Sequence, residues 1–153
     1  MGKTKNSGLS VEKSDPSRNN ASLKIDAVNR SSMIETLQSA GVRFTPEKVL
    51  FVTKDKSGQM VWLETGNTKS GLQHISKHID QFVEKHGIKP NYLASHIKNI
   101  ITYGIVVKSK LKRLKNGKMG YEKIYLYKNK YAALGAIGTN GYVVSIYPLS
   151  GGE

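Results

Sequence analysis

The C-terminal part of the chain carries the pattern that most restricts its fold. Hydrophobic and polar residues alternate with a period of two in four short runs, near residues 105–112, 120–128, 131–137 and 142–148. The turn signals between the runs are Asn116-Gly117, Asn129 and Asn140-Gly141. Because a period of two places successive side chains on opposite faces of a strand, four such runs with short turns predict an antiparallel meander.

The residues before this meander predict helices and one hairpin. Two β-rich segments, VLFVT at 49–53 and MVWL at 60–63, are separated by a Lys-Asp-Lys-Ser-Gly turn. Three segments have the periodicity of helices, at residues 32–41, 70–87 and 90–104. Helices followed by a sheet predict an α+β fold, with N-terminal helices packed on one face of the four-stranded antiparallel sheet.

The expected helix boundaries depend on capping residues. Ser32-x-x-Glu35 and Ser70-x-x-Gln73 both match the capping box, in which side chains satisfy the free amides of a first turn. Pro90 is suited to the start of the third helix. The glycines expected to end the three helices are Gly41, Gly87 and Gly104.

Length and composition limit the classes of protein to which the chain can belong. Its 153 residues suffice for one domain with a core. Residues 1–30, rich in Ser, Asn, Lys and Gly, predict a flexible arm or linker, and residues 31–150 the folded domain. No run approaches the roughly 18 apolar residues of a membrane-spanning helix. The absence of cysteine excludes disulfides, thiolate metal sites and cysteine catalysis.

Net charge is the strongest signal in the composition. The chain has 24 Lys and Arg against 11 Asp and Glu, which gives a net charge of +13. Such an excess attracts polyanions, so nucleic acid is the first expected partner, an anionic membrane the second and an acidic protein the third. The alternative is a solvated lysine surface that serves solubility. From residue 108 to 130, Glu122 is the one acidic residue among these basic ones: Lys108, Lys110, Lys112, Arg113, Lys115, Lys118, Lys123, Lys128 and Lys130.

Tyrosines alternate with lysines in the same region. A strand over residues 120–128 would point Tyr121, Lys123, Tyr125 and Tyr127 to one face. Tyrosine rings can stack on bases while lysines hold phosphates, although tyrosine is also a good strand former without any ligand. The residues expected to bind RNA are Lys77, Lys110, Lys112, Arg113, Tyr121, Lys123, Tyr125 and Tyr127.

Two histidines, His74 and His78, lie one helical turn apart in the second predicted helix. On a regular helix they share a stripe with Gln81 and Lys85, beside the apolar stripe, so both would flank the buried face. A zinc protease motif needs glutamate directly after the first histidine, but position 75 is isoleucine, and no third ligand is evident. We therefore expect no metal and no cofactor. A purely structural pair and an acid–base pair both remain open, since imidazole can donate or accept a proton near neutral pH.

Two segments resemble a known superfamily. WLETGNTKSGLQHISKH at residues 62–78 and IGTNGYVVSIYP at residues 137–148 resemble the C-terminal toxin domains of bacterial polymorphic and contact-dependent growth inhibition systems. These domains belong to the barnase/EndoU/colicin/RelE-like (BECR) ribonucleases. The resemblance covers roughly residues 44–148. It implies helices packed on a four-stranded antiparallel sheet whose face holds RNA.

The resemblance also implies a site and a biological setting. It places His74, His78, Thr139, Ser145 and Tyr147 at the catalytic centre. It implies a metal-independent endoribonuclease that cleaves RNA, often tRNA, by acid–base transphosphorylation. The toxin would be delivered by a producing bacterium, as part of a larger delivery protein, into the cytoplasm of a target cell. A cognate immunity protein, expected to be acidic, would neutralise it. The competing hypothesis is a non-catalytic basic module that binds nucleic acid.

Overall fold

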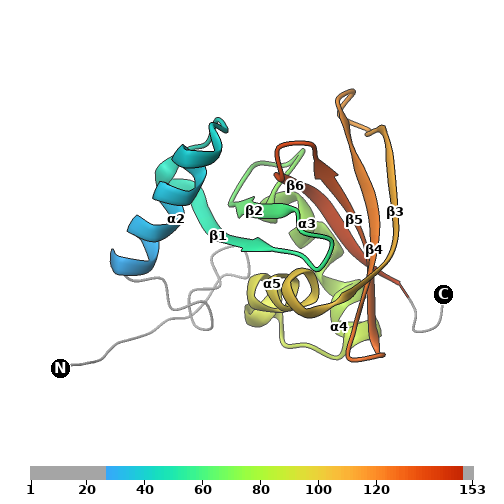
Figure 1. The fold of residues 1–153 in the computed structure, drawn as a ribbon. Helices are drawn as coiled ribbons and strands as arrows, with labels where there is room; N and C mark the ends of the chain where they lie inside the picture. The colour runs from blue at the N-terminus through green and yellow to red at the C-terminus, as the bar shows by residue number, and fades with distance from the viewer. Residues whose placement is uncertain (1–26, 150–153) are drawn as a thin grey trace.

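A four-stranded antiparallel sheet forms one side of the protein (Figure 1). The computed structural model describes residues 27–149, with side chains from Arg30 onward. Strands β3 (Ile105–Arg113), β4 (Met119–Tyr127), β5 (Tyr131–Gly138) and β6 (Val143–Leu149) lie in chain order, each antiparallel to the next. The predicted meander and the α+β class are therefore confirmed.

The predicted hairpin is also confirmed and forms a separate two-stranded sheet. Strand β1 (Val49–Lys54) pairs antiparallel with β2 (Met60–Glu64). Trp62 joins this hairpin to the main sheet, because its backbone amide donates to the Gly141 carbonyl at 2.9 Å. The indole Nε1 of the same residue donates to the Asn140 carbonyl at 3.0 Å.

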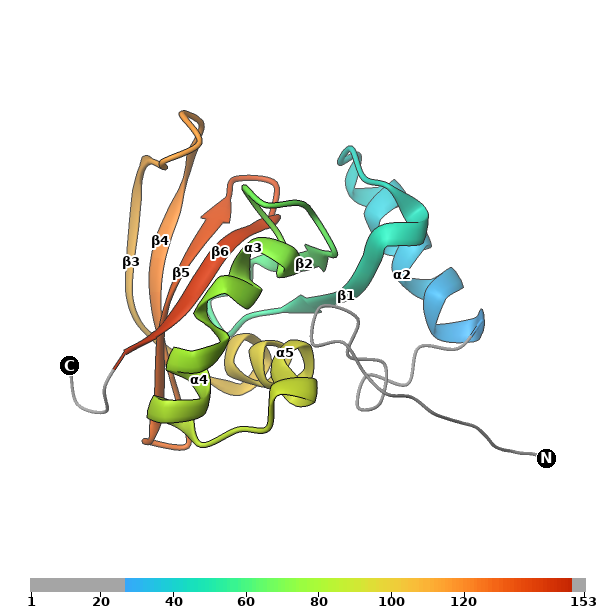
Figure 2. The same ribbon diagram turned by 180° about the vertical axis from the view of Figure 1, so that it is seen from behind.

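The helices differ in length from the sequence prediction, because the first is longer and the other two are shortened or broken. They are α2 (Ala27–Ala40), α3 (Leu72–Ile75), α4 (Ile79–His86) and α5 (Leu93–Tyr103), with short 3-10 turns η1 (Pro46–Lys48), η2 (Ser76–His78) and η3 (Pro90–Tyr92). The second predicted helix is interrupted at η2, between α3 and α4. Figure 2 shows α3 and α4 beside β5 and β6, and α2 at the far end of the molecule from β3.

Both capping-box predictions are wrong. Helix α2 begins at Ala27, so Ser32 lies inside it, and the carbonyl of Ser32 accepts a hydrogen bond from the Thr36 hydroxyl. The last four residues of the predicted arm are therefore helical, and the rest of the arm lies outside the described residues. The hydroxyl of Ser70 lies 2.9 Å from that of Tyr142 instead of capping α3. The predicted ends at Gly41, Gly87 and Gly104 are confirmed.

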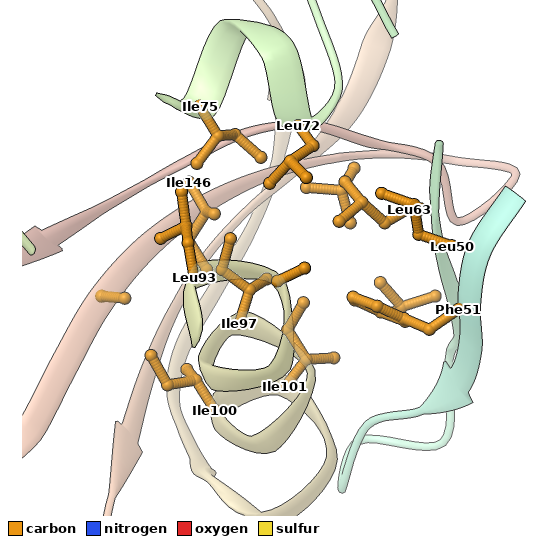
Figure 3. Close-up of a cluster of buried hydrophobic side chains, with 14 of the residues drawn as sticks. Leu50, Phe51, Leu63, Leu72, Ile75, Leu93, Ile97, Ile100, Ile101 and Ile146 are labelled. Carbon is orange, nitrogen blue, oxygen red and sulfur yellow. The ribbon is translucent and has the colours of Figure 1, made fainter. Parts of the chain in front are cut away.

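One apolar core joins α3, α4 and α5 to both sheets, whereas Leu37 of α2 packs with Val49 and Trp62 in a second, smaller cluster. Figure 3 shows Leu72 and Ile75 of α3 facing Ile146 of β6, with Ile97 of α5 and Phe51 of β1 in the same cluster. All five side chains are almost fully buried. Since burying one such side chain contributes about 1.5–3 kcal/mol, this cluster fixes the position of α3 against β6.

The helices cover the sheet face that the sequence predicts to bind RNA. Helix α5 contacts β4 and β5, and Tyr125 of β4 belongs to the core. Residues Ile124 and Leu126 point to the opposite, open face and are half-buried. The alternation along β4 is as predicted, but the predicted assignment of its two faces is wrong.

Lys123 and Tyr125 are therefore buried and cannot contact RNA, contrary to the prediction. The Nζ atom of Lys123 lies 2.7 Å from Oδ2 of Asp55, and Lys123 is only 2% exposed. It also donates to Ser57 Oγ at 2.9 Å and Gln59 Oε1 at 2.6 Å. The Tyr125 hydroxyl donates to the same Asp55 oxygen at 2.8 Å. These polar groups hold the β1–β2 turn against β4, and neither Lys123 nor Tyr125 is available to a ligand.

The charge of Asp55 is maintained by its partners. Burial alone would raise the pKa of its carboxyl, but hydrogen bonds from Lys123, Ser57 and Tyr125, with the charge of Lys123, lower the pKa below its ordinary value. Burial and the Asp55 charge raise the pKa of Tyr125. Asp55 and Lys123 thus form a buried ion pair, which is a structural element of the fold.

Candidate active site

The loop before α3 determines where the first histidine lies. The side-chain Oδ1 of Asn67 accepts hydrogen bonds from the backbone amides of Lys69 and Ser70 at 2.8 and 3.2 Å. Gly66 has a φ of +69°, and a Cβ there would collide with the Ser70 carbonyl. The Gly71 amide donates to the Val144 carbonyl of β6 at 3.1 Å. This folded loop attaches the start of α3 to the edge of the main sheet.

His74 and His78 lie close together at that edge, as the sequence predicts. Their ring centroids are 6.2 Å apart, and both side chains are half-buried. Nδ1 of His74 lies 2.9 Å from the carbonyl of Thr68. Because a carbonyl oxygen can only accept a hydrogen bond, Nδ1 of His74 carries a hydrogen, and Nε2 takes no part in this bond. Nδ1 of His78 lies 3.3 Å from the amide of Gln81, which can serve either ring tautomer.

Strand β6 brings Tyr147 to the same place. The Tyr147 and His78 ring centroids are 5.7 Å apart, and Tyr147 is 36% exposed. Ser145, two residues earlier, points to the same open face and is half-buried. We call His74, His78 and Tyr147 the edge cluster, since all three lie where α3 and η2 meet β6. The structure therefore brings together three of the five residues expected at the catalytic centre, with Ser145 nearby on the same strand.

Thr139, the fifth residue expected at the catalytic centre, lies away from Tyr147 of the edge cluster. It lies in the turn after β5, whereas Tyr147 pairs with Leu134, five residues earlier. Strand rise places the two positions roughly 15 Å apart. A bulge between Ala136 and Ile137 also shifts the register of β6. As a result Val143 points into the core, away from the face that Ser145 and Tyr147 share.

Nearby positive charge and burial act on His78. Burial lowers the pKa of His78, and the charges of His74, Lys77 and Lys115 lower it further. The neutral ring, which can accept a proton, is therefore favoured near pH 7. Lys115 lies in the β3–β4 turn and is absent from the residues that the sequence predicts for the site. The effect of Lys115 on the pKa of His78 depends on how the β3–β4 hairpin curves, and no local sequence pattern indicates that curvature.

Most of the predicted basic residues lie on an exposed strand edge. Lys110 and Arg113 of β3 are exposed and Lys112 is half-buried, as is Tyr121 of β4. Lys112 lies 3.6 Å from Glu122, and Arg113 donates to the Gly117 carbonyl at 2.7 Å. Lys77 is exposed in η2, beside the histidines. The hairpin of β3 and β4 extends past the neighbouring strands (Figure 1), so its basic side chains are accessible to a polyanion.

The other two histidines form a separate buried pair. Nδ1 of His86 lies 2.8 Å from Nε2 of His96, and Nε2 of His86 lies 3.0 Å from the Ala132 carbonyl. His86 must donate to the carbonyl, so its Nδ1 accepts and Nε2 of His96 donates. Both rings contact Tyr131, with centroids 5.2 and 5.0 Å away. This pair joins α4 and α5 to the start of β5.

Acid is expected to destabilise the fold through this pair. Burial, followed by the charge of His86, lowers the pKa of His96 to about 4. Burial also lowers the pKa of His86. Hydrogen bonds to backbone carbonyls raise this pKa in part, and the charge of Lys85 lowers it. The unfolded chain binds protons at these histidines more tightly than the folded chain does. The contribution of the neutral pair to stability is therefore complete above pH about 6.5 and is lost as the pH falls towards 4. The expected loss is about 3 kcal/mol in the free energy of unfolding.

Urea unfolding at a series of pH values measures this effect. His96→Leu removes the titrating ring, so its stability should change less between pH 6.5 and 4 than that of the unmodified chain. Protonation of Asp55 acts at lower pH, because the pKa of that carboxyl is already below its ordinary value. An equally steep pH dependence in the variant would show that the His86–His96 pair does not cause the acid sensitivity.

Neither comparison with known proteins nor the positions of possible metal ligands assigns a function to this site. Within residues 27–149, no group of three or more His, Cys, Asp or Glu side chains is arranged to hold a metal ion. None of the helices described is long and apolar enough to cross a membrane. No protein-family model matches the chain, and no curated protein matches it. The edge cluster and the basic hairpin beside it are therefore the features from which a function can be inferred.

Proposed function

We propose that this protein is a metal-independent endoribonuclease, with tRNA as its expected substrate, that acts as a toxin in other bacteria. The observation that carries the proposal is the edge cluster: two imidazoles 6.2 Å apart, with Tyr147 beside one of them. RNA carries its own nucleophile, the 2′-hydroxyl. Cleavage therefore needs a base for that hydroxyl, an acid for the departing 5′-oxygen and positive charge near the phosphate.

The two histidines fit different parts of this reaction. The lowered pKa of His78 favours the neutral ring near pH 7, which suits a base. His74 keeps its bond to the Thr68 carbonyl when protonated, since Nδ1 carries a hydrogen in either state, so it suits an acid. Lys77 and Lys115 supply positive charge beside His78. The toxin role is supported by the resemblance of residues 62–78 and 137–148 to BECR toxin domains.

The experiment that tests the proposal compares RNA with DNA. The purified chain is incubated in EDTA with a labelled single-stranded RNA and with DNA of the same sequence. Cleavage of the RNA alone is expected, because DNA has no 2′-hydroxyl. A basic binding module would retain both nucleic acids without cutting either, and a metallonuclease would be inactive in EDTA. Either result would contradict the proposal.

The basic hairpin is expected to hold RNA through its phosphates. Replacing Lys110, Lys112 and Arg113 together with glutamine should reduce the slope of log affinity against log salt by up to about 2–3, close to one unit for each phosphate that is no longer neutralised. Binding is measured by titration at several salt concentrations, with RNA on a His78→Ala background.

A matched triple variant controls for the change in net charge. Replacing Arg43, Lys48 and Lys54 with glutamine removes the same charge from three exposed residues between α2 and the β1–β2 turn, outside both the β3–β4 hairpin and α4. It should change the salt slope much less. Equal changes in the two variants would mean that RNA responds to net charge alone and does not bind the hairpin.

A further inference from the structure

Three tyrosines form a ladder of rings at the end of the sheet farthest from the β3–β4 turn. The rings of Tyr103 and Tyr127 are stacked, with centroids 6.4 Å apart and planes inclined by 30°. Tyr127 faces Tyr131 across the β4–β5 hairpin, with centroids 5.9 Å apart. The ladder combines the last residue of α5 with the two residues that flank the hairpin turn. Of the three, the sequence pattern singles out Tyr127 alone, as one of the residues expected to bind RNA on the sheet face.

Two lysines lie over the same rings. Nζ of Lys128 is 5.3 Å from the centroid of Tyr127, and Nζ of Lys130 is 5.2 Å from that of Tyr131. Lys128 and Asn129 both have a φ of 57° and are the two central residues of the turn closed by the hydrogen bond from the Lys130 amide to the Tyr127 carbonyl. Asparagine or glycine adopts this conformation at lower cost than lysine. The turn therefore holds a strained lysine at the position where its ammonium group meets a tyrosine ring.

The outermost ring of the ladder is the most exposed of the three. Tyr131 and Tyr127 are half-buried and contact the core, but Tyr103 is 60% exposed. Most of the Tyr103 surface is therefore accessible to a ligand. Helix α5 has no acidic residue, and both turn lysines are exposed. The surface thus offers aromatic faces and positive charge without negative charge from α5 or the turn.

We propose that Tyr103, Tyr127 and Tyr131, with Lys128 and Lys130, form a second binding site that stacks unpaired bases of single-stranded RNA. Such sites combine aromatic rings, which stack on any base, with cations that follow the phosphates. The choice of RNA rests on the proposed function, whereas the stacking chemistry does not. The tyrosine ladder and the edge cluster lie at opposite ends of α4, which spans about 12 Å. A few nucleotides beyond the cleaved bond would reach the ladder.

Binding of an uncleavable ligand tests this site independently of catalysis. Fluorescence anisotropy is measured with the unmodified chain and a short labelled single-stranded DNA, which lacks the 2′-hydroxyl that the proposed cleavage requires. Tyr103→Ala should weaken binding about 5- to 100-fold, the loss expected when one base no longer stacks. Tyr103→Phe keeps the ring and should bind like the unmodified chain. If RNA is never cleaved but Tyr103→Ala still weakens binding, the proposed function fails and the second site stands.

Two controls separate stacking from other effects. Tyr92 is also an exposed tyrosine, 43% accessible, in η3, and Tyr92→Ala should leave affinity unchanged. Circular dichroism should show that Tyr103→Ala keeps its fold, since that ring is mostly in solvent. Equal affinity of folded Tyr103→Ala and the unmodified chain would overturn the proposal. So would an equal loss in Tyr92→Ala, because the effect would then not belong to the ladder.

Discussion

Replacing His78 with alanine is expected to lower the rate of RNA cleavage by about 10²–10⁴-fold, the contribution of a general acid or base. His78 lies between His74 and Tyr147 and is the one member of the edge cluster whose ring is near both of the others. Its lowered pKa favours the form that accepts a proton near pH 7. The measurement is a single-turnover assay in EDTA, with the protein in excess over labelled RNA.

Two further variants make the result specific to the site. His74→Ala should cause a loss of similar size, because both imidazoles take part in the proposed proton transfer. Glu84→Ala removes an exposed charge from α4 and should leave the rate unchanged. The histidine side chains are only half-buried, so each substitution should change the free energy of unfolding by no more than about 1 kcal/mol. A folded His78→Ala protein that cleaves at the unmodified rate would disprove the assigned role.

Replacing Lys123 with methionine is expected to lower the free energy of unfolding by about 3–5 kcal/mol. The substitution removes the cation 2.7 Å from Asp55 and leaves a carboxylate that is 3% exposed without its partner. The remaining bonds from Tyr125 and Ser57 cannot supply the missing charge. Urea unfolding measures the change at pH 7, where Asp55 is ionised.

The chain offers a matched control for this buried pair. Lys112 and Glu122 form an ion pair 3.6 Å apart, with side chains 42% and 35% exposed. Lys112→Met should therefore cost no more than about 1 kcal/mol. Replacing Asp55 with asparagine together with Lys123→Met should cost less than the sum of the single changes, because the double variant leaves no unpaired charge. Equal losses of unfolding free energy in Lys123→Met and Lys112→Met would show that burial does not make the fold more dependent on an ion pair.

Strand positions could be predicted from sequence because a period of two is a local property. All four strands of the meander and the β1–β2 hairpin can be located this way. Which face becomes buried depends on what packs against it, and here Asp55 from a distant turn neutralises Lys123 within the core. A lysine in a tyrosine-rich strand resembles a binding surface in sequence. Alternation alone could not distinguish the two faces.

The edge cluster was predictable only in part. The spacing of His74 and His78 places both rings on one side of a helix, and they remain neighbours despite the break at η2. The proximity of Tyr147 depends on how β6 lies against α3, and the bulge near Ile137 changes that register. The tyrosine ladder joins α5 to β4 and β5 across non-local contacts. Sequence spacing contains little information about such contacts.

The chemical identity of the RNA ends tests the central claim most directly. The purified chain is incubated with a defined RNA in EDTA, and the ends of the fragments are determined. Attack by the 2′-hydroxyl, with His74 and His78 transferring protons, predicts a 2′,3′-cyclic phosphate on one fragment and a 5′-hydroxyl on the other. Fragments with a 3′-hydroxyl and a 5′-phosphate would show that water or a metal-bound hydroxide is the nucleophile, and would contradict the proposed mechanism.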